Sequence, residues 1–226
     1  MDLKKVYSNR FEHSDRAAKE AVWQVLCHDH FQKYISHDDT VLDLGAGYCE
    51  FLKYIRCRER IAVDLNPEVS SFAPPGTKVI VASGHNLKDQ CADNSVDIIF
   101  ASNFFEHLPD KAILMATLEE IFRILSPGGK LLVLQPNIRI LGGSYWDFID
   151  HHIPITDRML AEALKMVGLE VSEIHPRFLP YTTRSSIPKH PFLVRLYLKF
   201  TPIWQIMGGQ FWLVAVKPPV AGSMNA

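Results

Sequence analysis

Short apolar runs alternate with longer amphipathic segments along most of the chain. Five runs have the length and the β-branched content of buried strands, and they cover 41–44, 60–64, 78–82, 96–102 and 130–135. Strands that are apolar on both faces are typical of a parallel sheet with helices on each side. The alternation therefore predicts an α/β fold built around a mostly parallel sheet.

Several of the intervening segments have helix signals. The clearest amphipathic helix is predicted over 109–125, and the glycines at 128 and 129 are expected to end it, because glycine readily takes the left-handed conformation that follows a helix. Its apolar face consists of Ile113, Leu114, Leu118, Ile121 and Leu125. Thr156 is expected to cap another helix, which reaches Val167 and stops at Gly168.

The first and last parts of the chain complete this pattern. Residues 1–40 are predicted to be helical, with a Ser-Asp pair at 14–15 as the cap of one helix, and to form a lid over the site. Further strands are expected at 169–175 and 210–217. The sheet would then contain seven strands.

The segment 41–47, VLDLGAG, is the most informative part of the sequence. Gly45 and Gly47 follow the end of an apolar strand, so the chain can turn sharply there and a ligand can approach the bare backbone. A helix begins after this loop, and the unpaired N–H groups of its first turn attract carboxylate or phosphate. Asp64 ends the second strand, where a nucleotide-binding fold needs an acid for the ribose hydroxyls. This order of elements predicts a nucleoside site.

The residues of the loop indicate which nucleoside it binds. A dinucleotide fingerprint requires a third glycine, and Glu50 stands in that position, where its carboxylate disfavours a diphosphate. Asp43, directly before the loop, suits a ligand with positive charge. S-adenosylmethionine has an ammonium group, a sulfonium and a ribose but no phosphate, so it fits.

Four segments resemble the class I S-adenosylmethionine-dependent methyltransferases of the small-molecule type, related to quinone-biosynthesis methyltransferases (the methyltransferase type 11/12 group). They are VLDLGAG (41–47), AVDLNPE (62–68), DNSVDIIFASNFFEHL (93–108) and LSPGGKLLVLQPN (125–137). The resemblance implies a Rossmann-like sheet of seven mostly parallel strands, with helices on both faces and an antiparallel last strand. It also implies S-adenosyl-L-methionine as the cofactor.

The resemblance assigns the cofactor-binding residues. The first motif holds the methionine part and the second binds the ribose, which implies those roles for Asp43, Gly45, Gly47 and Asp64. The family usually has an acid after its third strand, but 82–87 reads ASGHNL here, so we expect Asn86 or backbone groups to bind the adenine. The other residues expected at the cofactor are Leu44, Ala46, Leu65, Leu87, Ser102 and Asn103.

Three histidines are candidates for a general base. A hydroxyl acceptor loses its proton near the transition state of methyl transfer, and histidine is the usual base near neutral pH. His151 and His152 follow Asp150 in a loop after the fifth strand, and His107 follows the fourth strand, so all three are near the carboxyl ends of the strands. The alternative is that these side chains bond only to the loop backbone. No metal is expected in the reaction.

The composition narrows the kinds of partner. The 226 residues suit one α/β domain, interpreted as 1–218, followed by a flexible tail at 219–226. The net charge of −1 gives no reason to expect a nucleic acid partner. The four cysteines lack metal-ligand spacing and are interpreted as reduced thiols. We expect neither a signal peptide nor a membrane-spanning run, so a cytoplasmic location is predicted.

The segment 177–209 is longer than a closing hairpin needs and is interpreted as an insertion. It contains basic and aromatic residues and no Asp or Glu. Three interpretations remain open: a helical cap on the core, which we favour, a surface for a lipid-linked acceptor with peripheral membrane contact, and a nucleic acid contact, which ranks last. The sequence does not fix the oligomeric state.

The sequence as a whole predicts methyl transfer from S-adenosylmethionine to a small-molecule, lipid-linked or glycan-linked acceptor. The candidate histidine bases favour oxygen as the methylated atom. Two alternatives are an NAD(P)-dependent oxidoreductase on a Rossmann fold and a non-catalytic S-adenosylmethionine-binding module. Glu50 in the third glycine position argues against the first, and the intact motifs argue against the second.

Overall fold

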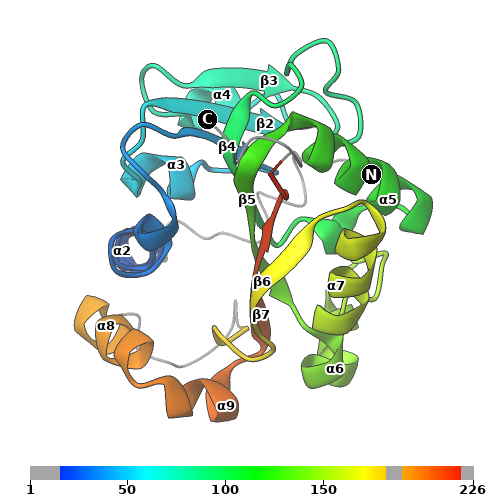
Figure 1. The fold of residues 1–226 in the computed structure, drawn as a ribbon. Coiled ribbons are helices and arrows are strands. Elements are labelled where there is room, and N and C mark those ends of the chain that lie inside the picture. The colour runs from blue at the N-terminus through cyan, green and yellow to red at the C-terminus, as the bar shows by residue number, and fades with distance from the viewer. Residues whose placement is uncertain (1–15, 182–189, 220–226) are drawn as a thin grey trace.

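The structure is a computed structural model that describes residues 16–181 and 190–219 (Figure 1). In this part of the chain, seven strands form one sheet in the order β3-β2-β1-β4-β5-β7-β6. Their bounds are β1 Thr40–Leu44, β2 Glu59–Asp64, β3 Lys78–Val81, β4 Val96–Ser102, β5 Leu125–Pro136, β6 Glu170–His175 and β7 Gln210–Val216. β7 is antiparallel to both of its neighbours, and the other pairs are parallel. The predicted fold class is confirmed.

Helices cover both faces of the sheet (Figure 1). The α-helices are α2 Arg16–Asp29, α3 Glu50–Tyr54, α4 Val69–Phe72, α5 Lys111–Ile124, α6 Ile138–Leu141, α7 Asp157–Met166, α8 Pro191–Lys199 and α9 Trp204–Met207. Short 3₁₀ helices are η2 Phe31–Tyr34, η3 Phe105–His107, η4 Gly142–Asp147 and η5 Thr201–Ile203. Residues of α5 and α7 belong to one hydrophobic cluster, and residues of α2, α3 and α9 belong to a second.

The central strand β1 shows how the apolar pattern sets the two layers. All five of its residues are buried, as expected for a parallel strand between two helical layers. Successive side chains of a strand point to opposite faces, and Leu42 and Leu44 pack in the α5/α7 cluster while Val41 packs in the α2/α3 cluster. Asp43 therefore faces the α2/α3 side, where the glycine loop lies.

Two predicted helix boundaries have different outcomes. The Thr156 cap is confirmed: its side chain accepts a hydrogen bond from the backbone N–H of Met159, and Gly168 has a φ of +92° after the helix. The prediction that glycines end α5 is wrong. The helix stops at Ile124, Leu125 is already extended, and β5 begins there. Residues 126–129 form an irregularity in the strand, since the pairing with β4 shifts between Val96 and Ile98.

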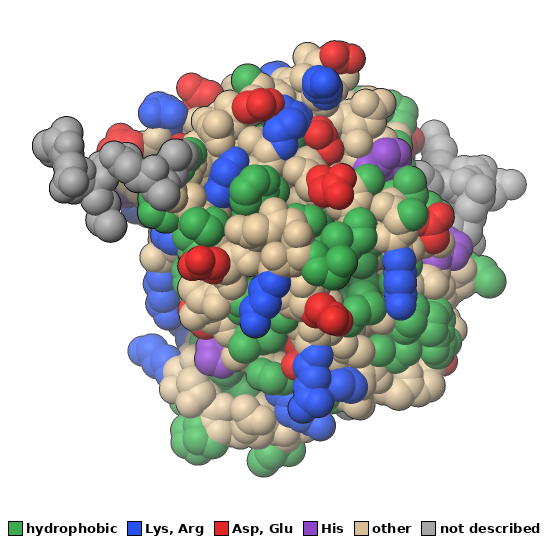
Figure 2. Space-filling model, turned by 45° about the vertical axis from the view of Figure 1, so that its right-hand side comes forward, with side chains coloured by type: hydrophobic (Ala, Val, Ile, Leu, Met, Phe, Trp, Pro, Cys, Tyr) green, Lys and Arg blue, Asp and Glu red, His purple; other side chains and the backbone are tan. Residues whose placement is uncertain are grey.

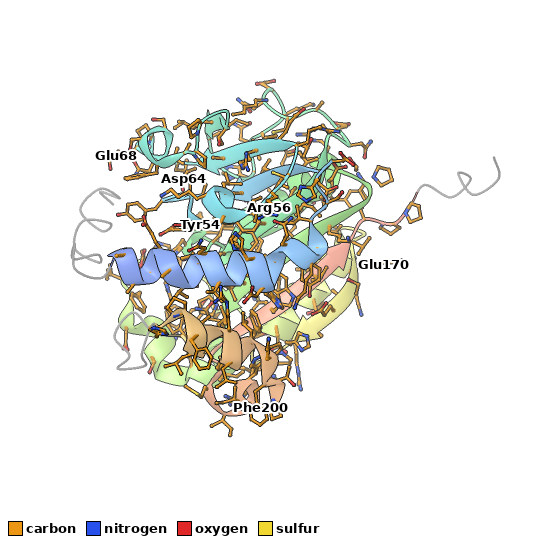
Figure 3. All side chains as sticks on the ribbon, turned by 90° about the vertical axis from the view of Figure 1, so that its left-hand side faces the viewer. Tyr54, Arg56, Asp64, Glu68, Glu170 and Phe200 are labelled. Atoms are coloured by element: carbon orange, nitrogen blue, oxygen red, sulfur yellow. The ribbon has the colours of Figure 1, made fainter. Side chains whose placement is uncertain are left out.

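α8 and α9 lie between β6 and β7. Figure 3 shows α8 beside α2, and an ion pair of 3.1 Å joins Arg195 Nε to Asp29 Oδ2 across the two helices. The Tyr197 hydroxyl donates to the carbonyl of Phe178, and Trp204 Nε1 donates to the carbonyl of Tyr197 at 2.9 Å. These bonds attach α8 and α9 to each other and to the chain after β6.

Some expectations concern parts of the chain that the structure does not describe. The cap at 14–15 and the first part of the N-terminal lid lie outside the described residues, as does nearly all of the tail at 219–226. Among the described helices, none is long and apolar enough to cross a membrane.

Candidate active site

A cavity of about 460 Å³ lies at the carboxyl ends of the central strands. Open α/β sheets bind their ligands at this edge. The residues that surround it include Lys19, Trp23, Asp43, Leu44, Gly45, Ala46, Gly47, Tyr48, Glu50, Asp64, Leu65, Ser83, Gly84, His85, Ser102, Asn103, Phe104, His107, Ile113, Asp150 and His152. The cavity therefore joins the predicted cofactor residues of 43–47 to two of the three candidate bases.

The glycine loop has a shape that only glycine accepts easily. Gly45 and Gly47 have φ values of +76° and +52°. A Cβ atom on Gly45 would lie 2.6 Å from the Phe104 ring, which is closer than carbon atoms approach without a shift. The N–H groups of Gly45 and Ala46 donate to the carbonyl of Val63 at 2.9 and 3.0 Å, which ties the loop to β2.

Three acidic side chains give this end of the cavity a negative potential. Burial raises the pKa of the Asp43 carboxyl well above its usual range, and the charges of Glu50 and Asp64 raise it further. Lys19 Nζ lies 2.7 Å from Glu50 Oε1, so one cation already balances part of the charge. A cationic ligand would relieve the remaining repulsion, whereas a diphosphate would increase it.

Asp64 is held at the end of β2 by backbone donors. Its Oδ2 accepts from Gly47 N–H and its Oδ1 from Asn66 N–H, both at 2.8 Å. Each carboxylate oxygen can accept a second bond, so this side chain still has acceptor capacity for two hydroxyl groups. Leu65, which follows it, also lines the cavity.

The predicted adenine contacts need a correction. The chain lines the cavity with Ala82, Ser83, Gly84 and His85, but not with Asn86 or Leu87. The backbone N–H of Asn86 donates to the carbonyl of Ser83 at 3.0 Å in a local turn. Leu87 is buried in the core, and its N–H donates to Glu120 Oε2 at 3.1 Å.

The end of β4 places two predicted residues at the cavity. Ser102 and Asn103 both line it, and they are joined by a bond of 3.1 Å from Asn103 Nδ2 to Ser102 Oγ. Asn103 has a φ of +47°, an uncommon conformation that is found often at functional sites. Its buried Oδ1 has no hydrogen-bond partner among the described residues.

His107 occupies the other end of the cavity. Its Nδ1 lies 2.9 Å from the carbonyl oxygen of Asp150. A carbonyl can only accept, so Nδ1 carries the proton and donates it, and in the neutral ring Nε2 has a free lone pair. Asp150 Oδ2 lies 3.3 Å from Nδ1 and Glu106 Oε1 lies 3.8 Å from Nε2, so two carboxyl groups flank the ring.

The two adjacent histidines of the loop have different positions. His152 is exposed at the cavity, and its N–H donates to the Glu106 carbonyl at 2.8 Å. His151 does not line the cavity. Its ring packs behind His107, with centroid distances of 5.2 Å to His107, 4.8 Å to Tyr145 and 5.2 Å to Phe148, and burial lowers its pKa.

The buried carboxyl group of Glu106 lies beside the rings of His107 and His151. Glu106 is almost fully buried, and its Oε2 accepts a bond of 2.6 Å from Gln135 Nε2. Glu106, His107 and His151 each have a potential ligand atom within 4.8 Å of the others. One Glu106 oxygen bonds to Gln135 and one His107 nitrogen to Asp150, whereas the buried Nδ1 of His151 has no hydrogen-bond partner among the described residues. The absence of a metal from the reaction stays a prediction.

Sequence reasoning missed several residues of the site. Lys19, Trp23 and Phe104 line the cavity, and Gln135 holds Glu106 from the end of β5. Gln135 has a signal in the sequence, since it is a polar residue at the end of an apolar strand. Lys19 and Trp23 have no such signal, because they belong to α2, and the position of this helix over the sheet depends on tertiary packing.

Comparisons with known proteins agree with this geometry. A methyltransferase domain family matches residues 42–133. The malonyl-[acyl-carrier protein] O-methyltransferase 1 of Coxiella burnetii is 35% identical over 114 residues, which are 50% of this chain and 39% of that protein. A methyltransferase of Aspergillus luteorubrus is 28% identical over 43% of this chain and 40% of its own length. The chain thus spans about two fifths of the length of these curated relatives.

Solved structures have the same fold. A chain from a complex of a methyltransferase activator with a methyltransferase of Haloferax volcanii has a TM-score of 0.67 at 21% identity, with 92% of this chain and 95% of that chain covered. An S-adenosylmethionine-dependent methyltransferase of Archaeoglobus fulgidus has a TM-score of 0.63 at 20% identity, with 84% and 90% covered. These solved structures show the fold of the chain, and the match over 42–133 shows that this part of it resembles a methyltransferase domain.

Proposed function

We propose that the protein transfers the methyl group of S-adenosylmethionine to a hydroxyl oxygen of its acceptor. One observation carries this proposal: a single cavity has three carboxylates at one end and His107 at the other. The carboxylates suit a cationic methyl donor, and the histidine suits an acceptor that must lose a proton. The two groups that the reaction needs are therefore in one enclosed space.

The donor end accounts for each part of S-adenosylmethionine. Asp64 would accept hydrogen bonds from the ribose hydroxyls, and Asp43 and the glycine loop would hold the methionine part. The Ser83–His85 segment would face the adenine. The methyl donor is already activated by its sulfonium charge, so these contacts act by positioning it for in-line attack.

The acceptor end contains a base that can remove the proton of the acceptor hydroxyl group. As the acceptor oxygen forms its bond to the methyl carbon, the carbon–sulfur bond breaks and its electron pair stays on sulfur. The hydroxyl proton moves to Nε2 of His107, the nitrogen that is unprotonated in the tautomer described above. Asp150 and Glu106 stabilise the imidazolium that forms, and His151 positions the ring from behind.

The same carboxylates favour a hydroxyl over a carboxylate acceptor. Glu106 and Asp150 lie close to His107, so an anionic acceptor would be repelled. Leu108, Pro109 and Ile113 give the wall near His107 an apolar part. The similarity to a malonyl-[acyl-carrier protein] O-methyltransferase over half of the chain supports oxygen as the methylated atom, but it does not favour a hydroxyl over a carboxyl oxygen. A neutral hydroxyl on a partly apolar or lipid-linked molecule fits best.

Calorimetry with S-adenosylhomocysteine and with NAD tests the donor end. We expect the first to bind and the second to give no heat, because Glu50 occupies the position of the third glycine of a dinucleotide site. Incubation of the protein with labelled S-adenosylmethionine and fractionated cell extracts then tests turnover. Binding without label transfer to any fraction would favour a non-catalytic module.

A further inference from the structure

We propose that the outer side of α8, with Ile206 of α9, is a membrane-binding surface for anionic phospholipid. This surface, here called the α8 face, consists of Phe192, Leu193, Leu196, Phe200 and Ile206. The role of this face in presenting the acceptor rests on the proposed function. The binding of the face to lipid does not depend on that function. The face would let the protein reach an acceptor whose hydroxyl group is attached to a lipid.

α8 is apolar on both sides. Its inner side packs in the core through Val194, Tyr197 and Leu198. Its outer side exposes 64% of Phe192, 41% of Leu193, 53% of Leu196 and 57% of Phe200. Phe192, Leu196 and Phe200 recur every four residues and form one stripe. A surface helix of a water-facing domain has a polar outer side, so a helix that is apolar all round indicates an apolar neighbour.

The figures show that this surface is not a recess of the core. Figure 3 places Phe200 at the outer edge of the helical layer, on the side away from Asp64. Figure 1 places α8 at the lower left of the molecule and α9 at its lower edge. Figure 2 shows other exposed hydrophobic side chains on the face that it presents. Ile206, which is 80% exposed, extends the apolar stripe onto α9.

The charge of the segment between β6 and β7 favours an anionic over a neutral lipid surface. Between β6 and β7 the sequence contains no Asp or Glu, and Lys199 is a basic residue of α8. The other basic residue of the helix, Arg195, pairs with Asp29 of α2. Lysine and arginine can extend to phosphate headgroups while apolar neighbours enter the acyl boundary. A second copy of this chain would bring an identical basic segment against the first, so the same charges disfavour self-association through this face.

Continuous packing connects the segment to the acceptor end of the cavity. The ring of Tyr181, early in the segment, lies 5.8 Å from that of Phe148. Phe148 stacks on His151 at 5.2 Å, directly behind His107. Trp146 and Ile149, on either side of Phe148, expose 48% and 82% of their surface. This packing ties the start of the segment, at Tyr181, to the ring behind His107.

Vesicle co-sedimentation of the full chain tests the proposal. The probes are vesicles of phosphatidylcholine alone and of phosphatidylcholine with about one quarter phosphatidylglycerol. We expect binding to the anionic vesicles only, and a decrease of about tenfold for the double variant Leu196→Glu with Phe200→Glu. Lys199→Glu should also weaken binding. Met166→Glu is the matched control, because Met166 is an apolar residue of α7 that is 73% exposed.

The outcomes separate this surface from the cofactor site. S-adenosylhomocysteine binding is measured for each variant and also reports folding. Lost vesicle binding with retained ligand binding in the double variant supports the α8 face. Absence of binding to anionic vesicles by the native chain overturns it, and so does an equal loss in Met166→Glu. A native dimer that Leu196→Glu dissociates would overturn it in favour of self-association. Vesicle binding without S-adenosylhomocysteine binding would contradict only the proposed function.

Discussion

The backbone N–H of Gly47 donates a hydrogen bond of 2.8 Å to Oδ2 of Asp64, so the glycine loop after β1 and the acid at the end of β2 form one unit. Val63 strengthens the unit, since its carbonyl accepts from both Gly45 and Ala46. Binding of the methionine part and binding of the ribose part of the donor are thus expected to depend on the same two strands, β1 and β2.

Replacement of Asp64 by Ala should weaken S-adenosylhomocysteine binding by about 1–3 kcal/mol, because the ribose hydroxyls lose their acceptor and Gly47 N–H loses its partner. Isothermal calorimetry measures the change. Asp93→Ala is a control, since that exposed carboxylate pairs with Arg123 far from the loop. Equal affinities of native protein and Asp64→Ala would exclude the ribose role.

Replacement of Gly45 by Ala should destabilise the protein and abolish donor binding. The new Cβ meets the Phe104 ring at 2.6 Å, and a φ of +76° adds about 1 kcal/mol of backbone strain. Gly76→Ala is the control, because Gly76 has a φ of +80° with no atom within 4 Å of the Cβ position. Urea unfolding gives the free energy of unfolding of both variants, and the difference between them measures the effect of the contact with Phe104. An equal loss of stability in the two variants would show that this contact has no effect.

Replacement of His107 by Ala should lower kcat by about a hundredfold or more and leave S-adenosylhomocysteine affinity unchanged, because only proton removal is lost. His152→Ala should have a smaller effect. His151→Ala should lower kcat, because the ring of His107 loses the side chain that positions it. His151→Phe keeps a ring against Phe148 and should recover part of that kcat. Transfer of labelled methyl to the active extract fraction is the measurement. Full activity of His107→Ala would eliminate it as the base.

Chelator treatment should leave methyl transfer unchanged. The reason is that a sulfonium donor is already activated and needs no Lewis acid. Activity is compared before and after dialysis against EDTA. A loss that Zn²⁺ or Mg²⁺ restores would instead make Glu106, His107 and His151 a metal site.

His30 should make the protein less stable in mild acid. Burial lowers the pKa of its imidazole from 6.5 to about 3, with smaller contributions from Lys33 and His175. Below pH 6.5 the unfolded chain therefore binds a proton that the folded chain does not, and stability falls as pH falls. The loss between about pH 7.5 and about pH 5 should be roughly 2 kcal/mol in urea unfolding.

The matched variant for this effect is His30→Phe. An aromatic ring at this position keeps the packing against Phe178 and Trp212, whose centroids lie 4.6 and 5.0 Å away. The variant should lose the part of the pH dependence between pH 5 and pH 7 that comes from His30. An unchanged slope would assign the acid sensitivity to other groups.

The sequence was sufficient to predict the sheet and the place of the glycine loop and Asp64 at the carboxyl ends of its strands, because both depend on local patterns. Val41 to Leu44 are apolar on both faces around one acid, and that pattern requires a buried strand with the acid beside the loop. Thr156 was predictable for the same reason, since a cap bonds to a neighbour three residues away.

The errors and omissions occurred where hydrogen bonds and packing that the hydrophobic pattern does not show decide the conformation. Gly128 does not end α5, because its N–H donates to the carbonyl of Lys217, at the far end of the chain, within the irregular start of β5. Asn86 does not line the cavity and donates to Ser83 in a local turn, and Lys19 reaches Glu50 from a separate helix. The position of His151 behind His107 likewise depends on tertiary contacts with Tyr145 and Phe148.

The ring of Phe104 fills the space beside two glycines at once. Its Cδ2 lies 2.6 Å from the Cβ position of Gly45, and its Cζ lies 3.1 Å from that of Gly84. Positions 45, 84 and 104 should consequently vary together among homologous sequences, with any side chain at either glycine accompanied by a smaller residue in place of the phenylalanine.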